Sequence, residues 1–213
     1  MKIRTYHGTT ASIDVDAQKG FTPICPNELP VIDGHLIVDE LNKQATKARY
    51  RLFSKDVHPT NAIYFANDQH PQFSTIEDSD NADIYWNSHC VSGTVGSELL
   101  DGLPKPEEYD FFIAKGFEPN LHPYSACYHD LDKTISTGII EWLKNKNINT
   151  VLVGGLALDY CVYETVADLR KNGFLVVINK SATKSIGNFN EAIERLIFIG
   201  CVIVENSDEI ELV

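Results

Sequence analysis

Short apolar runs alternate with amphipathic segments along nearly the whole chain. The runs are rich in β-branched residues, which is typical of strands covered on both faces, and they predict strands over 11–15, 50–54, 109–114, 150–153, 174–179 and 201–205. Apolar residues at helical spacing predict helices over 35–45, 131–143 and 190–199, and a further helix that starts at Cys161 and stops before Gly173. This order predicts an α/β protein with a mostly parallel central sheet and helices on both faces.

One long stretch departs from this pattern. From about residue 59 to 106 the chain is irregular and rich in Pro, Asn, Asp and Ser. An excursion of this length inside a compact domain is more often a functional loop than packing filler. We therefore predict a single domain over residues 1–213, with a loop at about 59–106 that serves a metal or a substrate.

Charge and cysteine content narrow the class of protein. The formal net charge is −12, which argues against nucleic acid or an anionic membrane as a partner. No apolar run approaches membrane-spanning length, and the N-terminal residues lack an apolar signal core. The five cysteines are odd in number and form no Cys-x-x-Cys pair, a pattern of reduced thiols. We expect a cytoplasmic protein with a small-molecule substrate. The sequence leaves open whether the protein forms a homo-oligomer.

Three chemically reactive residues follow predicted strands. Asp16 and Lys115 come directly after two of them, and Cys161 follows a turn that contains Gly154 and Gly155. In a parallel sheet these carboxyl ends meet at one edge. A cysteine at a helix start, where free N–H groups favour the thiolate, can attack a carbonyl carbon if an acid moves the proton and a lysine holds that acid. Each residue also has a plainer interpretation when taken alone: Asp16 as a turn cap, Lys115 as a surface lysine and Cys161 as a small buried residue.

A second polar group indicates a metal site. Asp56 and His58 belong to an Asp-x-His-Pro sequence directly after a predicted strand, and His89 lies in the long loop. One carboxylate and two imidazoles suit a divalent transition metal with open positions. A second Asp-x-His-Pro, around His70, follows no strand, so we favour the first. A turn aspartate with an exposed histidine is the alternative.

Aromatic residues offer walls for a pocket. Phe21, Trp86 and Tyr124 fall in loops near these groups, where large apolar side chains suit a flat substrate. Packing of the loops is the alternative for each of them.

Several motifs follow one another along the chain. They are Asp16-Ala-Gln-Lys-Gly-Phe21, Asp56-Val-His58-Pro, His89-Cys-Val-Ser-Gly-Thr-Val-Gly96, Lys115-Gly and Gly155-Leu-Ala-Leu-Asp-Tyr-Cys161-Val. In this order they resemble the motifs of nicotinamidases, within the isochorismatase-like family of cysteine hydrolases. The matching stretches run from about residue 11 to 183.

The resemblance implies a three-layer, Rossmann-like α/β/α fold and a catalytic triad of Asp16, Lys115 and Cys161. It also implies a cis peptide bond before Ala157, with the N–H groups of Ala157 and Cys161 forming an oxyanion hole. The substrate ring is expected between Phe21 and Trp86, with its nitrogen facing the metal.

The resemblance further implies one divalent metal held by Asp56, His58 and His89, with zinc favoured over iron or manganese. Ala62 stands where some family members have another histidine, so water or His70 is expected to complete the shell. Val57 replaces a usual tryptophan and Leu158 a frequent threonine, which makes the substrate less certain than the reaction type.

The implied activity is a metal-dependent amidohydrolase that converts nicotinamide to nicotinate and ammonia through a cysteine thioester, as in NAD salvage. The alternative is a cysteine hydrolase of the same family that acts on another small amide or carbamoyl compound. A non-enzymatic metal-binding or thiol-redox protein is disfavoured, because the sequence shows no resolving cysteine close to Cys161.

Overall fold

Six parallel strands form the central sheet. The computed structural model describes residues 2–213, and Met1 lies outside the described residues. The sheet order is β4-β3-β2-β5-β6-β7, and each neighbouring pair is parallel. The strands are β2 (Thr10–Val15), β3 (Tyr50–Asp56), β4 (Phe111–Lys115), β5 (Thr150–Gly155), β6 (Leu175–Thr183) and β7 (Val202–Val204). The chain runs outward from β2 to β4, crosses back to β5 and runs outward again, so the switch point lies between β2 and β5.

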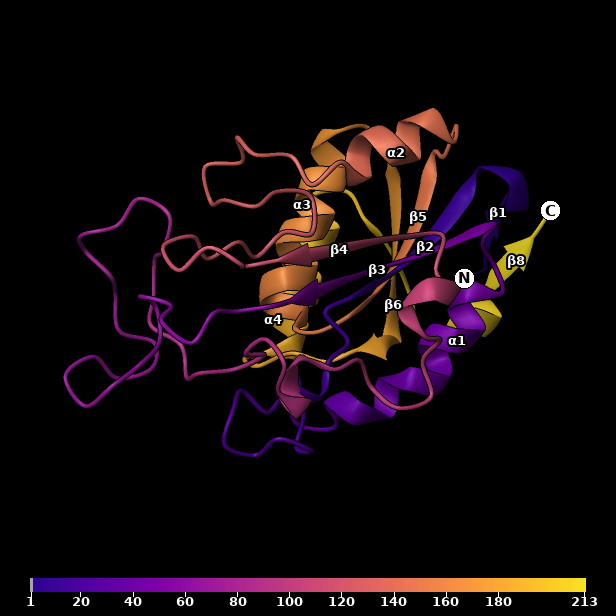
Figure 1. The fold of residues 1–213 in the computed structure, drawn as a ribbon. Coiled ribbons are helices and arrows are strands. Elements are labelled where there is room, and N and C mark those ends of the chain that lie inside the picture. The colour runs from indigo at the N-terminus through magenta and orange to yellow at the C-terminus, as the bar shows by residue number, and fades with distance from the viewer. Residues whose placement is uncertain (1) are drawn as a thin grey trace.

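Helices cover both faces of this sheet (Figure 1). α1 (Val38–Ala45) contacts β2, β5 and β6 from one side. α2 (Ile139–Asn145), α3 (Tyr163–Lys171) and α4 (Phe189–Phe198) lie on the other side. The sheet is buried between these layers, because strand residues such as Ile13, Val153 and Val177 are almost fully hidden from solvent. The predicted three-layer α/β/α fold with a parallel sheet is confirmed.

The predicted helix over 131–143 was wrong in its first half. α2 begins only at Ile139, after Gly138 with its left-handed φ of 88°. The Asp130 carboxylate accepts hydrogen bonds from the N–H groups of Thr134 (3.0 Å) and Ile135 (2.9 Å). These side-chain bonds compete with the helical ladder, so residues 131–138 form an irregular turn.

The helix that carries Cys161 begins earlier than predicted. One turn of π-helix spans Leu158–Val162 and continues directly into α3. Cys161 is therefore the fourth residue of this helical segment rather than its first.

The chain ends pair with each other. β1 (Ile3–Thr5) and β8 (Ile210–Leu212) form a separate two-stranded parallel sheet, an arrangement that the sequence left open. In Figure 1 this sheet lies at the end of the molecule away from the long loops. Short 3-10 turns complete the structure at His7–Thr9, Lys19–Phe21, Gly34–Ile37, Val95–Ser97, Pro106–Glu108 and Ser207–Glu209.

The connection from β3 to β4 extends beyond the carboxyl ends of these strands (Figure 1). Isolated bridges such as that between Phe65 and Trp86 hold it together. Tyr64 and Trp86 are fully buried, so the inner part of this connection is packed against the body of the protein.

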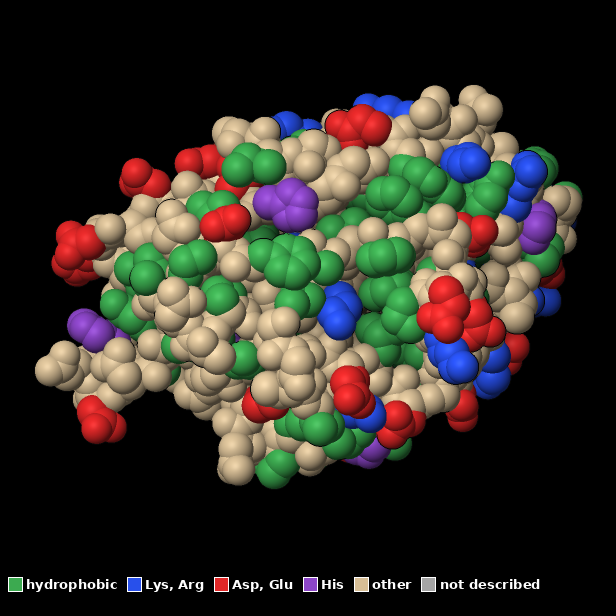
Figure 2. All heavy atoms as spheres, in the orientation of Figure 1, with side chains coloured by type: hydrophobic (Ala, Val, Ile, Leu, Met, Phe, Trp, Pro, Cys, Tyr) green, Lys and Arg blue, Asp and Glu red, His purple; other side chains and the backbone are tan. Residues whose placement is uncertain are grey.

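The surface carries charges of both signs. On the face in Figure 2, acidic side chains are spread widely, and basic side chains lie singly or beside acidic ones. Across residues 2–213, no helix combines the length and the apolar composition needed to cross a membrane.

Candidate active site

The carboxyl ends of β2, β4 and β5 bring three side chains together. Asp16 directly follows β2, Lys115 ends β4, and Cys161 lies in the helical turn after β5. Lys115 Nζ lies 3.0 Å from Asp16 Oδ2 and 3.8 Å from Cys161 Sγ. All three side chains are buried, with Cys161 6% exposed and the other two fully hidden. The structure thus gathers the three residues at the edge where the sequence placed them.

Burial at this edge favours the protonated thiol of Cys161. Burial raises the pKa of Cys161 well above its usual range, and Lys115 only partly opposes this. Burial also raises the pKa of Asp16, again against the opposing charge of Lys115. The two carboxylates outweigh burial and raise the pKa of Lys115, which is therefore an ammonium. Burial thus opposes the thiolate that we expected the helix start to favour, so the cysteine needs a partner to take its proton.

The turn before the nucleophile is fixed by close backbone packing. Gly155 has a φ of 126°, and a Cβ there would lie 1.9 Å from the carbonyl oxygen of Val15. Leu156 N–H donates to that same carbonyl at 2.8 Å. The peptide bond between Leu156 and Ala157 is cis, as predicted. Only glycine allows β5 to end so close to β2, and this closeness brings the cysteine turn next to Asp16.

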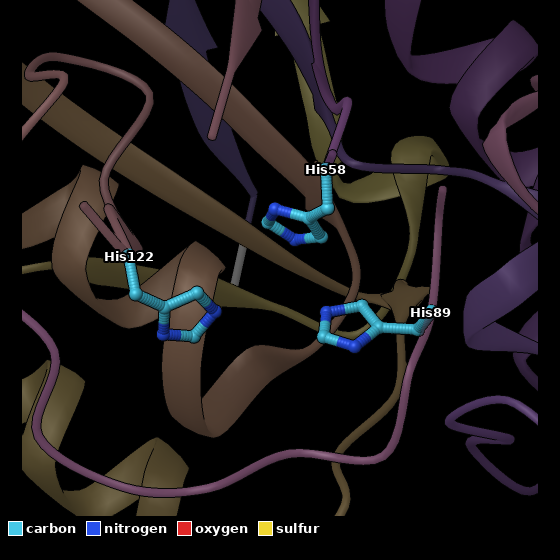
Figure 3. A group of neighbouring side chains, drawn as sticks. All are labelled: His58, His89 and His122. Carbon is cyan, nitrogen blue, oxygen red and sulfur yellow. The ribbon is translucent and has the colours of Figure 1, made fainter. Parts of the chain in front are cut away.

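Three histidines face one another beside these residues (Figure 3). One ring nitrogen from each of His58, His89 and His122 lies within 4.8 Å of the others. His58 Nε2 and His122 Nδ1 are buried without a hydrogen-bond partner. His89 Nδ1 pairs with the carbonyl of Asn87 at 2.6 Å, which leaves Nε2 for a ligand. Buried nitrogens without partners are costly in an empty cavity, and a bound cation would satisfy them.

The donor set suits a divalent transition metal. Asp56 Oδ2 lies 3.5 Å from His58 Nε2, so a carboxylate borders the histidine cluster. Burial opposes the charge of Asp56, but Lys115 and His58 outweigh it and hold its pKa far below the usual range. Burial, and then the neighbouring His58, lower the pKa of His89 to about 3 and that of His122 well below its usual value. Neutral imidazole and ionised carboxylate are the forms that bind zinc.

His122 was not predicted, and His70 does not take the place suggested for it. His70 is exposed and stacks on Tyr85, with ring centroids 4.7 Å apart, outside the histidine cluster. His122 lies in an irregular segment, where no periodicity points to it. The available signal was a third His-Pro dipeptide, His122-Pro123, whose proline carbonyl accepts a hydrogen bond from Lys115 Nζ at 3.1 Å.

A small cavity of about 20 Å³ lies between Cys161 and the histidine cluster. Its apolar walls include Phe21 and Trp86, as proposed from the sequence, together with Leu29, Tyr160 and Ile186. Tyr124 lies behind the wall instead, where its hydroxyl accepts from Trp86 Nε1 at 3.1 Å and donates to Asp83 at 2.7 Å. Tyr160 directly precedes the cysteine but was not predicted, because the helical spacing does not indicate that its side chain points toward the site.

The chain is similar in sequence and in fold to known amidases. A nicotinamidase of Acinetobacter baylyi is 36% identical over 178 residues, which is 83% of this chain and 81% of the relative. The structure of PnC1 from L. infantum in complex with nicotinate has a TM-score of 0.83 at 27% identity and covers 100% of both chains. A pyrazinamidase of Pyrococcus horikoshii in complex with zinc has a TM-score of 0.73 at 28% identity, over 92% of this chain and 98% of the other. The sequence profile of the Isochorismatase domain matches residues 10–197, most of the protein, and the chain therefore belongs to the isochorismatase family.

Proposed function

We propose that this protein is a metal-dependent nicotinamidase, which hydrolyses nicotinamide to nicotinate and ammonia in NAD salvage. The observation that carries the proposal is the convergence of Asp16, Lys115 and Cys161 beside a cavity that Cys161 lines together with His89 and His122 of the histidine cluster. The similarity to a curated nicotinamidase and to a nicotinate-bound structure supports the choice of substrate. The five cysteines are unpaired, which supports the reducing cytoplasm as the compartment.

The first half of the reaction forms a thioester. Asp16 takes the proton of Cys161 as the sulfur attacks the amide carbon, so an S–C bond forms and the carbonyl oxygen becomes negative. The N–H groups of Ala157 and Cys161 stabilise this oxyanion, and such donors contribute about 3 kcal/mol each in other enzymes. The C–N bond then breaks as Asp16 returns its proton to the departing nitrogen, and ammonia leaves.

The second half consumes one water molecule. Asp16 removes a proton from the water as its oxygen attacks the thioester carbon. The C–S bond breaks, and the proton held by Asp16 returns to the sulfur of Cys161. The product forms as nicotinic acid and loses its carboxyl proton to solvent, which gives nicotinate. Lys115 keeps Asp16 in place and balances its charge in both halves, because its ammonium lies within hydrogen-bond distance of the carboxylate.

The residues proposed to hold the metal are Asp56, His58, His89 and His122. Three nitrogen donors and one oxygen donor fit zinc, and a related pyrazinamidase structure contains zinc. When bound, the ion supplies a positive centre that anchors the ring nitrogen of the substrate. Phe21 and Trp86 border the space where the flat ring is expected.

Ammonia release by the purified protein tests the function. We expect nicotinamide to be hydrolysed with a higher kcat/KM than benzamide, which lacks the ring nitrogen, or a ureido compound. Cys161→Ala should abolish turnover with an unchanged circular dichroism spectrum, whereas Cys201→Ala, which removes a thiol outside the site, should not. A preference for the ureido compound would favour the alternative substrate class, and native activity in Cys161→Ala would refute the thioester mechanism.

A further inference from the structure

The Glu28 side chain reaches from one loop into the loop that carries His89. Its carboxylate oxygen Oε2 accepts a hydrogen bond from the N–H of Cys90 at 2.8 Å. The backbone carbonyl of Glu28 accepts a second bond from the Asn87 side chain at 3.4 Å. These two contacts bracket His89 along the chain, one on each side.

The backbone next to His89 is held in an uncommon conformation. Cys90 has a φ of 46°, in the left-handed region that residues with a side chain rarely adopt. Such a conformation is unfavourable and persists only where its surroundings enforce it. The hydrogen bond from Cys90 N–H to Glu28 is one such constraint, and the bond from His89 Nδ1 to Asn87 fixes the ring.

The carboxylate of Glu28 occupies a space that two glycines leave free. A Cβ at Gly96 would lie 2.1 Å from both carboxylate oxygens, and a Cβ at Gly20 would lie 2.4 Å from Oε2. The side chain is therefore enclosed by backbone on two sides and is not a mobile surface group. The side chain is half-buried, and its carboxylate is held between these two glycines and the N–H of Cys90.

We propose that Glu28 is a positioning residue for His89 and that it thereby sets the metal affinity of the histidine cluster. This inference rests on the proposed metal site. Groups that orient a metal ligand typically change affinity by about 10–100-fold when they are removed. Glu28 acts here through the backbone of the ligand, whereas Asn87 acts through the ring nitrogen.

Zinc affinity, measured by competition with a chromophoric chelator, tests the proposal. Glu28→Ala should bind zinc about 10–100-fold more weakly than the native protein. Glu28→Gln removes the charge but keeps an oxygen acceptor, so it should retain most of the affinity. Glu98 is an exposed partner of Lys19 in a neighbouring loop, so Glu98→Ala removes a carboxylate away from His89 and should bind zinc normally. Equal losses in the alanine and glutamine variants would assign the effect to charge and overturn the positioning role, as would unchanged affinity in Glu28→Ala.

Two further measurements separate positioning from general damage. The absorption spectrum of the cobalt-loaded protein should change in Glu28→Ala, because the ligand field depends on how His89 is oriented. In a His89→Ala background, Glu28→Ala should cause no additional loss of zinc affinity, since the residue it positions is gone. A full additional loss there would overturn the proposal. If His89→Ala itself binds zinc like the native protein, the metal site fails and this inference fails with it.

Discussion

Lys115 and Asp56 form a buried ion pair that joins the two halves of the site. The same ammonium lies 3.0 Å from the Asp16 carboxylate. One cation therefore serves both the acid of the proposed triad and a candidate metal ligand, and its removal should affect stability as well as catalysis.

Lys115→Met should abolish ammonia release and lower the free energy of unfolding by about 3–5 kcal/mol, because two carboxylates would stay buried without their cation. Urea denaturation and an ammonia assay measure the two effects. Lys19→Met is the control: its partners Glu98 and Asp101 are exposed, so its loss should cost no more than about 1 kcal/mol. Native stability in Lys115→Met would show that the two carboxylates are not both charged.

His122→Ala should weaken zinc binding by more than the roughly 10–100-fold typical of groups that only orient a ligand, because it removes a donor atom. His70→Ala should leave zinc affinity unchanged, since His70 lies outside the cluster. Zinc content after dialysis and competition with a chelator measure both variants. Equal affinities of the two variants would remove His122 from the ligand set.

Gly155→Ala should destabilise the protein by at least about 1–3 kcal/mol, because its methyl group would meet the Val15 carbonyl and the φ of 126° is unfavourable with a side chain. Gly8→Ala is a matched control, because a Cβ there meets nothing within 4 Å. Urea unfolding compares the two. A Gly155→Ala protein as stable as Gly8→Ala would mean that the turn tolerates a different backbone path.

Asp130 should contribute stability that depends on pH. Burial raises the pKa of Asp130, but hydrogen bonds from Thr134 and Ile135 outweigh it and lower the pKa below its usual value. The contribution is thus fully present above the unfolded pKa, about 3.9, and is lost as pH falls through the folded value. The difference in unfolding free energy between the native protein and Asp130→Ala should shrink between pH 6 and pH 2. A constant difference would show that the carboxylate is not the stabilising form.

The residues that end strands could be predicted from the strand pattern. In the irregular segments, His89 was predicted within a family motif, whereas His122 lies outside every such motif. Asp16, Asp56 and Lys115 stand at or directly after runs of β-branched and apolar residues, and parallel strands bring their carboxyl ends to one edge. His122 and Tyr160 reach the site through a loop and a π-helical turn, which have no simple periodicity. The same limit explains residues 131–138, where side-chain bonds to Asp130 override an apolar spacing that resembles a helix.

The cavity beside Cys161, with a volume of about 20 Å³, is walled largely by aromatic and aliphatic side chains. None of these wall side chains comes from a strand: Phe21 lies in a 3-10 turn, Trp86 and Ile186 in loops, and Tyr160 in the π-helical turn. Substitutions in these connecting segments can therefore change the shape of the cavity without disturbing the strands that hold Asp16 and Lys115.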